Sequence, residues 1–306
     1  MMKFTNNKNI PLPIAIWLAT NNYEYDTDDR VISATTLLKP LKAIHLARKY
    51  RENQKEVDVA DLSNLVMGSS IHAGIEEALE PDNIKKVSEL LGYNPDKVLE
   101  HLVVEKRTKK EINGYVISGQ FDMVYKGTVC DVKSTSTWKF ILGDGDDYIK
   151  QMSIYKWLNP ELITSNSGWI FYIFTDWSKA ESRRKSDYPQ DRIQSKEYVL
   201  DNSIEDYINK KTLALRALES IEDDKLPDCT PEERWEKKSV WKYYKGASRD
   251  RSTKNYDNPK DAYDAVAKGG GTVVEVKGES TGCKYCSVQN LCKQYTELKM
   301  MGMIGD

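Results

Sequence analysis

The sequence predicts an α/β fold in which a central mixed β-sheet is flanked by helices. Segments with helical apolar spacing alternate along the chain with short extended segments. Asn113-Gly114 is a strong signal for a two-residue turn, and it predicts a hairpin of strands at about 101–111 and 115–125. The continuous apolar run from Trp169 to Phe174 predicts a strand that is buried on both faces. A chain of 306 residues with 40% hydrophobic content is long enough to bury a large core.

The first apolar segment, Ile10 to Ala19, predicts a docking helix or strand. It is too short to cross a membrane, and Pro11 and Pro13 interrupt it. It also runs into a polar stretch, which is unlike a signal peptide. We therefore expect no membrane association and a cytoplasmic location.

The helices and loops of the chain follow from capping residues and apolar spacing. Ser33 is a predicted N-cap for a helix that reaches about Tyr50, and Pro40 either kinks this helix or marks its true beginning. A second helix is expected after Gly68. Further helices are predicted at about Asp144 to Leu158 and 203–221, and a loop or ragged hairpin at about 178–196.

The composition changes after about residue 225. We expect residues 1–225 to form the main domain and residues 226–306 to form a small, cysteine-tethered C-terminal subdomain. Within the second part, residues 236–280 are predicted to form a small α/β insertion. It would have strands at 240–244 and 272–276, and a helix at 259–267.

Two short motifs in the middle of the chain combine carboxylates with a lysine. Ser118-Gly119-Gln120-Phe121-Asp122 precedes Asp131-Val132-Lys133, and their acidic residues fall on neighbouring predicted strands. Because residues two apart share one face of a strand, Asp131 and Lys133 are expected to project together, with Val132 turned into the core. A carboxylate pair suits a hard divalent cation, and an adjacent ammonium group can position water and offset phosphate charge. The motifs therefore predict metal-dependent hydrolysis of a phosphodiester.

The neighbouring motifs give this pair a context. His72, on a predicted helix, and then Glu105 precede the two motifs in the sequence. Gln151 and Tyr155 come after the motifs, four residues apart on one helix face. This arrangement resembles the RecB-type branch of the PD-(D/E)XK nuclease superfamily over about residues 30–175. The segments that carry the resemblance are Met67-Gly68-Ser69-Ser70-Ile71-His72, Gly119-Gln120-Phe121-Asp122, Asp131-Val132-Lys133, and Gln151 with Tyr155.

The resemblance implies a restriction-endonuclease-like core and a metal site. Asp122 and Asp131 would bind Mg²⁺ or Mn²⁺, with the main-chain carbonyl of Val132 and the side chain of His72 as further ligands. Lys133 would orient or activate the attacking water and help neutralise the charge that develops on the phosphate.

The same resemblance assigns Gln151 and Tyr155 to the support of the site and the nearby DNA backbone, and Glu105 is kept as a further candidate carboxylate. It implies a Mg²⁺-dependent DNA nuclease of exonuclease type, from a phage or bacterium, in recombination, repair or phage DNA processing. The expected partners are DNA and a helicase, recombinase or other DNA-processing protein.

Other interpretations of these residues stay open. His72 would ordinarily be a packed or solvent-facing histidine, Tyr155 a core residue, and Glu105 a charge at a strand edge. Asp122 can merely pair with Lys133 across the strands, a contact that contributes little at a surface. A nuclease-fold protein that binds DNA without cleaving it, or a zinc-bearing interaction protein, remains an alternative.

Four of the five cysteines fall late in the chain. Cys283, Cys286 and Cys292 form a C-x₂-C-x₅-C pattern, and Cys229 is the plausible fourth ligand of a structural zinc ion or an iron–sulfur cluster. The pattern resembles the iron–sulfur clasp of AddB-type and CRISPR-associated RecB-like nucleases, which implies a 4Fe–4S cluster. In that family the remote cysteine precedes the nuclease motifs, whereas Lys39-Pro40 stands at the comparable place here. Zinc stays open as the alternative.

DNA contacts must come from a local groove, because the net charge is −2. The candidates are the basic runs Lys106 to Lys110 and Arg183 to Lys185, either of which can equally be a solvated face. Trp138 and Trp177 can stack on unpaired bases, or can serve in packing.

Overall fold

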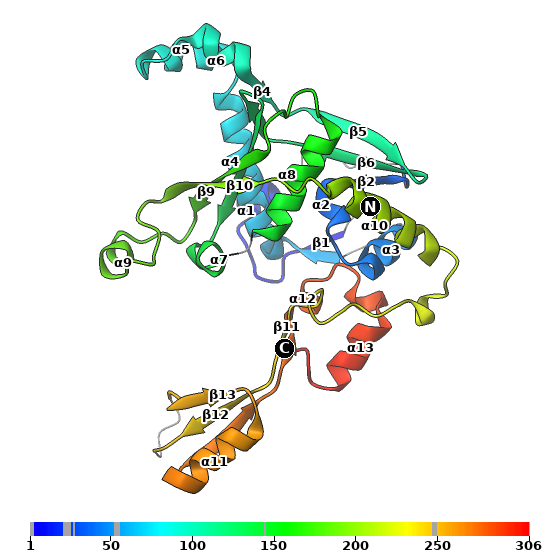
Figure 1. Ribbon diagram of the computed structural model, residues 1–306, viewed down its shortest axis with the longest axis vertical. Coiled ribbons are helices and arrows are strands. Elements are labelled where there is room, and N and C mark those ends of the chain that lie inside the picture. The colour runs from blue at the N-terminus through cyan, green and yellow to red at the C-terminus, as the bar shows by residue number, and fades with distance from the viewer. Residues whose placement is uncertain are drawn as a thin grey trace. The chain divides into compact units, whose positions relative to one another are not determined.

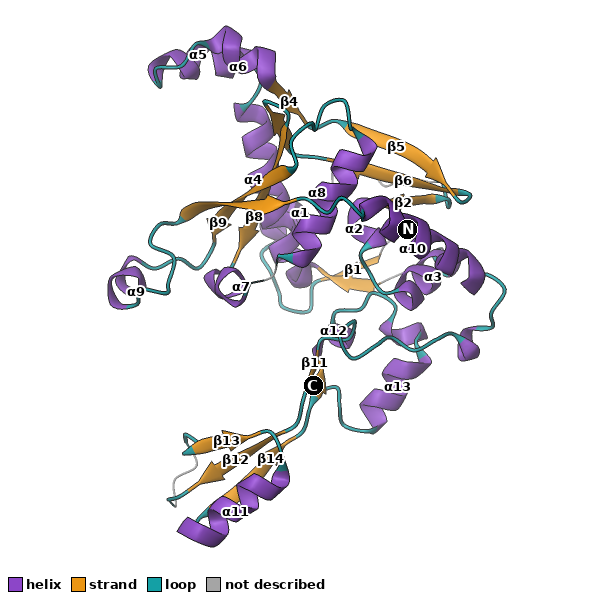
Figure 2. Cartoon of the chain, viewed as in Figure 1, coloured by secondary structure: helices purple, strands orange, loops and turns teal. Residues whose placement is uncertain are grey.

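The computed structural model describes residues 3–20, 26, 28–51, 56–143, 145–246 and 250–305. They confirm the predicted α/β class, with several sheets flanked by helices (Figure 2). The chain divides into two compact units. Unit 1 comprises residues 1–38 and 52–213, and unit 2 comprises residues 39–51 and 214–306. The domain boundary that the composition suggests near residue 225 remains a prediction.

The main sheet of unit 1 is mixed, as the sequence predicts. Its strand order is β10-β9-β8-β7-β4, in which β8 and β9 run parallel and the other neighbours run antiparallel. The strands are β4 (Leu102–Val104), β7 (Met123–Tyr125), β8 (Thr128–Thr135), β9 (Ser167–Phe174) and β10 (Ile193–Val199).

A second sheet in unit 1 contains the predicted hairpin. Strands β5 (Arg107–Ile112) and β6 (Tyr115–Gln120) pair antiparallel across Asn113-Gly114, both of which have positive φ angles, and β2 (Val31–Ser33) pairs parallel with β6. The expected arms at 101–111 and 115–125 were too long. Each is broken, and their outer parts pair separately as β4 and β7 in the main sheet. Glu105 has a φ of 42°, and this left-handed turn redirects the chain between β4 and β5.

Helix α8 (Asp146–Leu158) packs against the strands β6, β8 and β9, and nearly all of its residues from Gln151 onward are buried. Its close approach depends on Gly119, because a Cβ atom there would lie 2.6 Å from Leu158 Cδ1 and 3.0 Å from Tyr155 Cδ1. The predicted start of this helix, Asp144, lies outside the described residues.

The remaining elements of unit 1 surround these sheets (Figure 1). They are β1 (Lys3–Thr5), β3 (Glu56–Asp58), α1 (Leu12–Ala19), α2 (Ala34–Leu37), η1 (Val59–Leu62), α4 (Ser63–Ala78), α5 (Pro81–Leu90), α6 (Pro95–His101), α7 (Thr137–Leu142) and α9 (Lys179–Arg184). Helix α10 (Ile204–Leu218) runs from unit 1 into unit 2. No helix of the described residues is long and apolar enough to span a membrane.

Several expectations need correction. Ser33 does cap a helix, with its Oγ accepting from Thr36 N, but α2 ends before Pro40 and a separate α3 (Leu41–Lys49) follows. Proline cannot continue a helix from a preceding turn, so Pro40 begins the second one. Strand β9 alternates between buried and half-buried residues, because the second face is incompletely covered. The segment at 178–196, expected to be a loop or a ragged hairpin, lies in the hairpin between the antiparallel strands β9 and β10, and it contains the short helix α9, which was not predicted.

Unit 2 contains the predicted small α/β insertion. Its sheet has the order β13-β12-β14, and the strands Val240–Tyr244 (β12) and Thr272–Val276 (β14) coincide with the predicted ones. The predicted helix is α11 (Pro259–Gly269), which Asn258 caps. The other elements are η2 (Asp223–Lys225), β11 (Glu236–Lys237), β13 (Lys254–Tyr256), β15 (Glu279–Ser280), α12 (Thr281–Lys284), η3 (Gln289–Leu291) and α13 (Lys293–Met300).

Candidate active site and cysteine centre

Asp122 lies in the break between β6 and β7 and is held by the main chain around it. Its Oδ2 accepts a hydrogen bond of 2.7 Å from the backbone N–H of Val132, and its carbonyl oxygen accepts one of 3.0 Å from the N–H of Glu105. Since Phe121 beside it is fully buried, the backbone here is anchored in the core. One carboxylate oxygen of Asp122 is thereby used for positioning, and Oδ1 is left to face other groups.

His72, on α4, is the group that Oδ1 faces. His72 Nδ1 lies 3.4 Å from Asp122 Oδ1. The hydrogen bond to Asp122 raises the pKa of His72, against the opposing effect of burial. An imidazole nitrogen and a carboxylate oxygen at this separation can flank one cation, because ligands at about 2.1 Å on adjacent octahedral positions are about 3 Å apart.

Glu105 lines the same small cavity as His72, Asp122 and Val132. Its side chain accepts a hydrogen bond of 2.6 Å from Gln120 Nε2, and burial raises the pKa of its carboxyl group. The left-handed backbone at Glu105 turns this residue back toward Asp122. The structure thus places Glu105 beside the other candidate ligands.

Glu76 is a carboxylate that the sequence reasoning missed. It also lines this cavity, and its charge contributes to raising the pKa of Glu105. Glu76 follows His72 by four residues on α4, so the two share one helix face. The four-residue spacing from His72 was the sequence signal that could have identified Glu76 as a candidate ligand.

Asp131 and Lys133 project together from β8, as the strand period predicts. Asp131 Oδ2 lies 2.6 Å from Lys133 Nζ, and the side chains are 2% and 21% exposed. Burial raises the pKa of Asp131 while the charge of Lys133 opposes that shift. Burial lowers the pKa of Lys133, but Asp131 outweighs it and the pKa is raised overall. The charge of Asp131 therefore holds Lys133 in its ionised form, whereas Lys133 only partly offsets the effect of burial on Asp131.

Gln151 and Tyr155 lie behind Asp131 on α8. Gln151 Nε2 donates to Tyr155 Oη at 2.6 Å and to Asp131 Oδ1 at 3.4 Å, and all three side chains are buried. Tyr155 packs against Gly119. These two residues orient Asp131 from the helix that covers the sheet.

Tyr148 is a second residue that sequence reasoning missed. The ammonium groups of Lys133 and Lys139 lie 5.4 Å and 5.3 Å from the centre of its ring. A cation over an aromatic face is favourable by about 0.5–2 kcal/mol. Tyr148 falls seven residues before Tyr155 on α8, a spacing too common in helices to have pointed to this contact.

The oxygen-rich donor set fits Mg²⁺ or Mn²⁺ better than a soft metal. Asp131 Oδ2 is buried and, among the described residues, accepts no hydrogen bond of normal geometry, although Lys133 is close. That oxygen therefore keeps the capacity to bind a cation. The described residues contain no group of three or more His, Cys, Asp or Glu side chains already gathered around one metal position.

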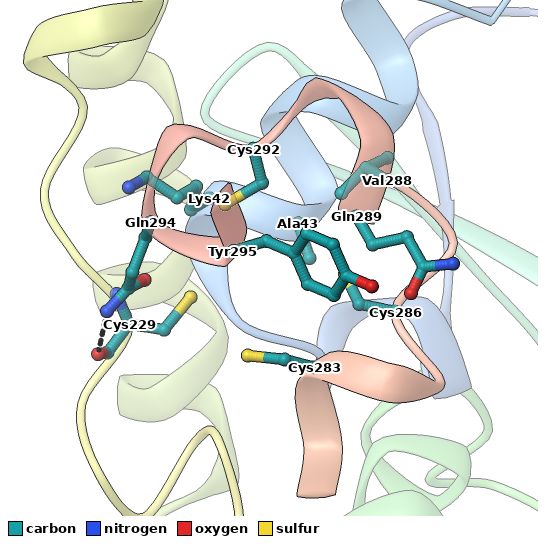
Figure 3. A pocket seen from close by; sticks show the side chains of 10 residues that line it. All are labelled: Lys42, Ala43, Cys229, Cys283, Cys286, Val288, Gln289, Cys292, Gln294 and Tyr295. Carbon is teal, nitrogen blue, oxygen red and sulfur yellow. Dashed lines mark hydrogen bonds between the residues drawn. The ribbon is translucent and has the colours of Figure 1, made fainter. Parts of the chain in front are cut away.

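The four late cysteines line one cavity in unit 2, together with residues of α3 and α13 (Figure 3). Cys229, Cys283 and Cys292 direct their sulfur atoms into a shared space, and the ring of Tyr295 lies across it. Cys130 is buried in unit 1, where it packs beside Asp131. The cavity brings Cys229 together with the C-x₂-C-x₅-C segment, but among the described residues these side chains are not gathered around one metal position.

Gln294 fixes the position of Cys229 and was not predicted. The backbone N–H of Cys229 donates to Gln294 Oε1 at 2.9 Å, and Gln294 Nε2 donates to the Cys229 carbonyl at 3.0 Å. Lys42 lines the same cavity with its side chain 6% exposed, and its ammonium group pairs with Asp228 at 2.7 Å. Gln294 therefore holds the backbone of Cys229 in place, and Asp228 compensates the charge of the buried Lys42.

Burial raises the pKa of Cys229 to about 12 and also raises that of Cys283. These two thiols thus stay protonated unless a positively charged centre displaces their protons. Soft thiolate donors suit zinc or an iron–sulfur cluster and not Mg²⁺.

The predicted DNA-contacting groups are largely engaged within the protein. Lys109 pairs with Asp26, Lys110 lies over the ring of Trp157 at 4.1 Å, and Lys185 pairs with Glu181 at 2.9 Å. Trp177 donates from Nε1 to the carbonyl of Pro189 at 2.9 Å. Trp138, in contrast, is 62% exposed.

No family model and no curated protein matches the sequence. Among solved structures, the chain is similar to the crystal structure of SSO0001, with a TM-score of 0.42 and 18% identity, over 70% of this chain and 89% of that one. It also has a distant structural neighbour in a phage-related exonuclease from Haemophilus somnus 129PT. There the TM-score is 0.29 and the identity 17%, over 48% of this chain and 69% of that one.

Proposed function

We propose that this protein is a divalent-metal-dependent DNA nuclease of the RecB type, and that it acts as an exonuclease in recombination, repair or phage DNA processing. One observation carries the proposal. The buried pair of Asp131 and Lys133 lies on β8 next to Asp122, whose Oδ2 binds the backbone N–H of Val132 in that same strand. A purely structural ion pair has no need of a second carboxylate and a histidine beside it.

The ligands of the divalent ion would be Asp122, Asp131, the carbonyl of Val132 and His72, with Glu105 and Glu76 available at the same cavity. When bound, Mg²⁺ or Mn²⁺ supplies charge stabilisation for a phosphodiester under attack. Val132 N–H holds Asp122 in place through one oxygen, so that Oδ1 stays directed toward His72. Gln151 and Tyr155 hold Asp131 from behind.

Lys133 supplies the cationic group at the reacting phosphate. Its ammonium group is paired with Asp131, which keeps it protonated and able to donate to a phosphate oxygen or to orient a water molecule. Tyr148 limits the directions in which the lysine can move. The expected role is transition-state stabilisation, so loss of Lys133 should lower kcat and kcat/KM together.

The late cysteines are proposed to hold a structural metal centre in unit 2. The resemblance favours a 4Fe–4S cluster, with zinc as the alternative. A cluster would bring a brown colour and stoichiometric iron and sulfide, whereas a zinc site would give zinc alone. Neither result bears on the active-site proposal, because that site lies wholly in unit 1.

The test uses labelled linear and circular DNA with the full chain and Mg²⁺. We expect degradation of the linear DNA, a loss of activity of at least a hundredfold in Lys133→Ala, and no change in Lys196→Ala, an exposed lysine on β10 of the same sheet. Cleavage of circular DNA at the same rate would replace the exonuclease assignment with an endonuclease. Full activity in Lys133→Ala, or DNA binding without any cleavage by the wild type, would refute the nuclease proposal.

A further inference from the structure

Helix α7 begins directly after the strand that carries the candidate catalytic residues (Figure 2). Strand β8 ends at Thr135, and Ser136 caps the helix through a hydrogen bond of 3.3 Å from Lys139 N to its Oγ. Thr137 follows Lys133 by four residues, about 13 Å of extended chain. A DNA strand with a phosphate at Lys133 could therefore reach α7 within a few nucleotides.

One side of α7 is firmly anchored. Thr137 is 2% exposed, and its N–H donates to Asp176 Oδ1 at 2.7 Å. Phe140 packs edge-on against Tyr172 and Phe174, with ring centres 4.9 Å and 5.2 Å apart. This face fixes the helix on the sheet without help from its other side.

The outer side of α7 carries two large apolar residues. Trp138 is 62% exposed and Leu142 is 78% exposed, and they are four residues apart on one helix face. Exposed apolar residues occur elsewhere on this protein too, so the case for a contact surface here rests on the lysines beside the pair. Since the buried face already secures the helix, folding does not account for Trp138.

Positive charge continues from the active site to this ridge. Lys139, the neighbour of Trp138, contacts the ring of Tyr148, whose ring also receives Lys133. A lysine beside an exposed tryptophan suits single-stranded DNA, because the lysine can contact a phosphate and the tryptophan can stack on an unpaired base. Trp177, the other candidate for stacking, is held by Pro189 and Arg192 and lacks this exposure.

We propose that Trp138, flanked by Leu142 and Lys139, forms a stacking subsite for an unpaired base of the DNA strand that reaches Lys133. The subsite would make the protein prefer single-stranded DNA or frayed ends over a fully paired duplex. This inference rests on the proposed nuclease function for its substrate, but its binding step does not require cleavage.

The test measures binding of a fluorescently labelled oligothymidine and of a blunt duplex by anisotropy, with Ca²⁺ in place of Mg²⁺. Because stacking of one base on an aromatic residue contributes to affinity, Trp138→Ala should weaken oligothymidine binding about tenfold, which is about 1.4 kcal/mol. Trp138→Phe should retain most of the affinity, and Trp138→Leu, which keeps the apolar area alone, should not. Duplex affinity should be unchanged.

Trp235→Ala is the matched control, because Trp235 is 61% exposed but belongs to unit 2. Equal single-strand affinity in Trp138→Ala and wild type, an equal loss on single strand and duplex, or no oligothymidine binding by the wild type would overturn the subsite. Trp138-dependent binding by a protein that never cleaves DNA would support the subsite while refuting the nuclease function. In an active enzyme, Trp138→Ala should raise KM for single-stranded ends and leave kcat nearly unchanged.

Discussion

At the scale of single residues, the candidate site depends on charges that are costly to bury alone. Asp131 is almost completely buried, and Lys133 keeps only a fifth of its side chain exposed. A buried pair of this kind contributes little net stability, but removal of one partner leaves the other uncompensated. We infer that the pair is retained for its chemistry and not for the fold.

Replacing both members of this pair should destabilise unit 1 by less than the two single replacements added together. In chelator, Asp131→Asn or Lys133→Met should each lower the free energy of unfolding by about 2–3 kcal/mol, below the range for fully buried pairs because Lys133 is partly exposed. The double variant should lose clearly less than the sum of the two. Urea unfolding curves measure all four proteins, and strictly additive losses would show that the two charges are not coupled.

At the scale of elements, the site depends on how closely α8 packs on the sheet. Gly119 lacks the Cβ that would collide with Leu158 and Tyr155, and Tyr155 is the residue that Gln151 contacts in positioning Asp131. A small change in the distance between helix and sheet is thereby transmitted to the carboxylate.

Gly119→Ala should therefore destabilise the protein by about 1–3 kcal/mol through overpacking. Gly74→Ala is the control, since a Cβ at this exposed position in α4 would meet nothing within 4 Å and should stabilise the helix by about 0.5–1 kcal/mol. Thermal unfolding compares the two. A Gly119→Ala protein as stable as the wild type would mean that α8 packs more loosely than the structure indicates.

Helix α3 is joined to η2 by Asp223, which accepts hydrogen bonds from Lys49, at 2.7 Å, and from Tyr50. The hydrogen bond from Lys49 has the largest effect in lowering the pKa of Asp223, and the hydrogen bond from Tyr50 lowers it further. A lowered carboxyl pKa stabilises the folded state above the unfolded value near pH 4, and this stabilisation is lost as the pH falls through the folded pKa.

Asp223→Asn should thus cost about 1 kcal/mol of unfolding free energy at pH 7, a modest amount because Asp223 is only partly buried, and clearly less at pH 2. Asp224→Asn, at the exposed neighbouring residue, should cost little at either pH. Urea unfolding at the two pH values provides the measurement. If Asp223→Asn lost as much unfolding free energy at pH 2 as at pH 7, the loss would come from altered packing and not from the carboxylate charge.

Local signals predicted several elements well. The insertion strands at Val240–Tyr244 and Thr272–Val276 were found because alternation and flanking turn residues define them locally. The break of the long hairpin arms at Glu105 and Asp122 was missed, since it depends on pairing of β4 with β7 across the sheet. The short helix α9 was missed within a polar segment that has no apolar stripe.

The site was predictable where its residues share a motif. Asp131 and Lys133 lie two apart on one strand, and Gln151 and Tyr155 lie four apart on one helix. The contacts that hold these groups were not predictable. Val132 N–H to Asp122, the two lysines on Tyr148, and the pair of Gln294 with Cys229 arise only when distant segments meet.

At the scale of the whole molecule, the two units differ in how they are stabilised. Unit 1 contains large sheets and many fully buried side chains. A core cluster of unit 2 consists of Leu46, Leu218, Leu226 and Val288, with Cys286 and Cys292 packed against it. Small cores of this kind commonly need a metal or a covalent link for stability.

Removal of the cysteine centre should therefore destabilise unit 2 selectively. Cys283→Ala should abolish metal content, measured as iron, sulfide and zinc, and should increase hydrogen exchange in η3 and α13 while the strands of unit 1 keep their protection. Cys130→Ala, at the buried cysteine of unit 1, should leave the metal content intact. Unchanged metal content in Cys283→Ala would show that this cysteine is not a ligand.

Asp122, Asp131 and Lys133 are proposed to form a phosphodiester-cleaving site that needs a divalent cation. The most direct measurement is the rate of linear DNA degradation by the wild type and by Asp131→Asn, each with Mg²⁺ and with chelator, and with Asp147→Asn on the exposed start of α8 as the control. We predict cleavage only with Mg²⁺, a loss of at least a hundredfold in Asp131→Asn, and wild-type rates in Asp147→Asn. Cleavage that persists in chelator, or in Asp131→Asn with Mg²⁺, would contradict the proposed metal-dependent site.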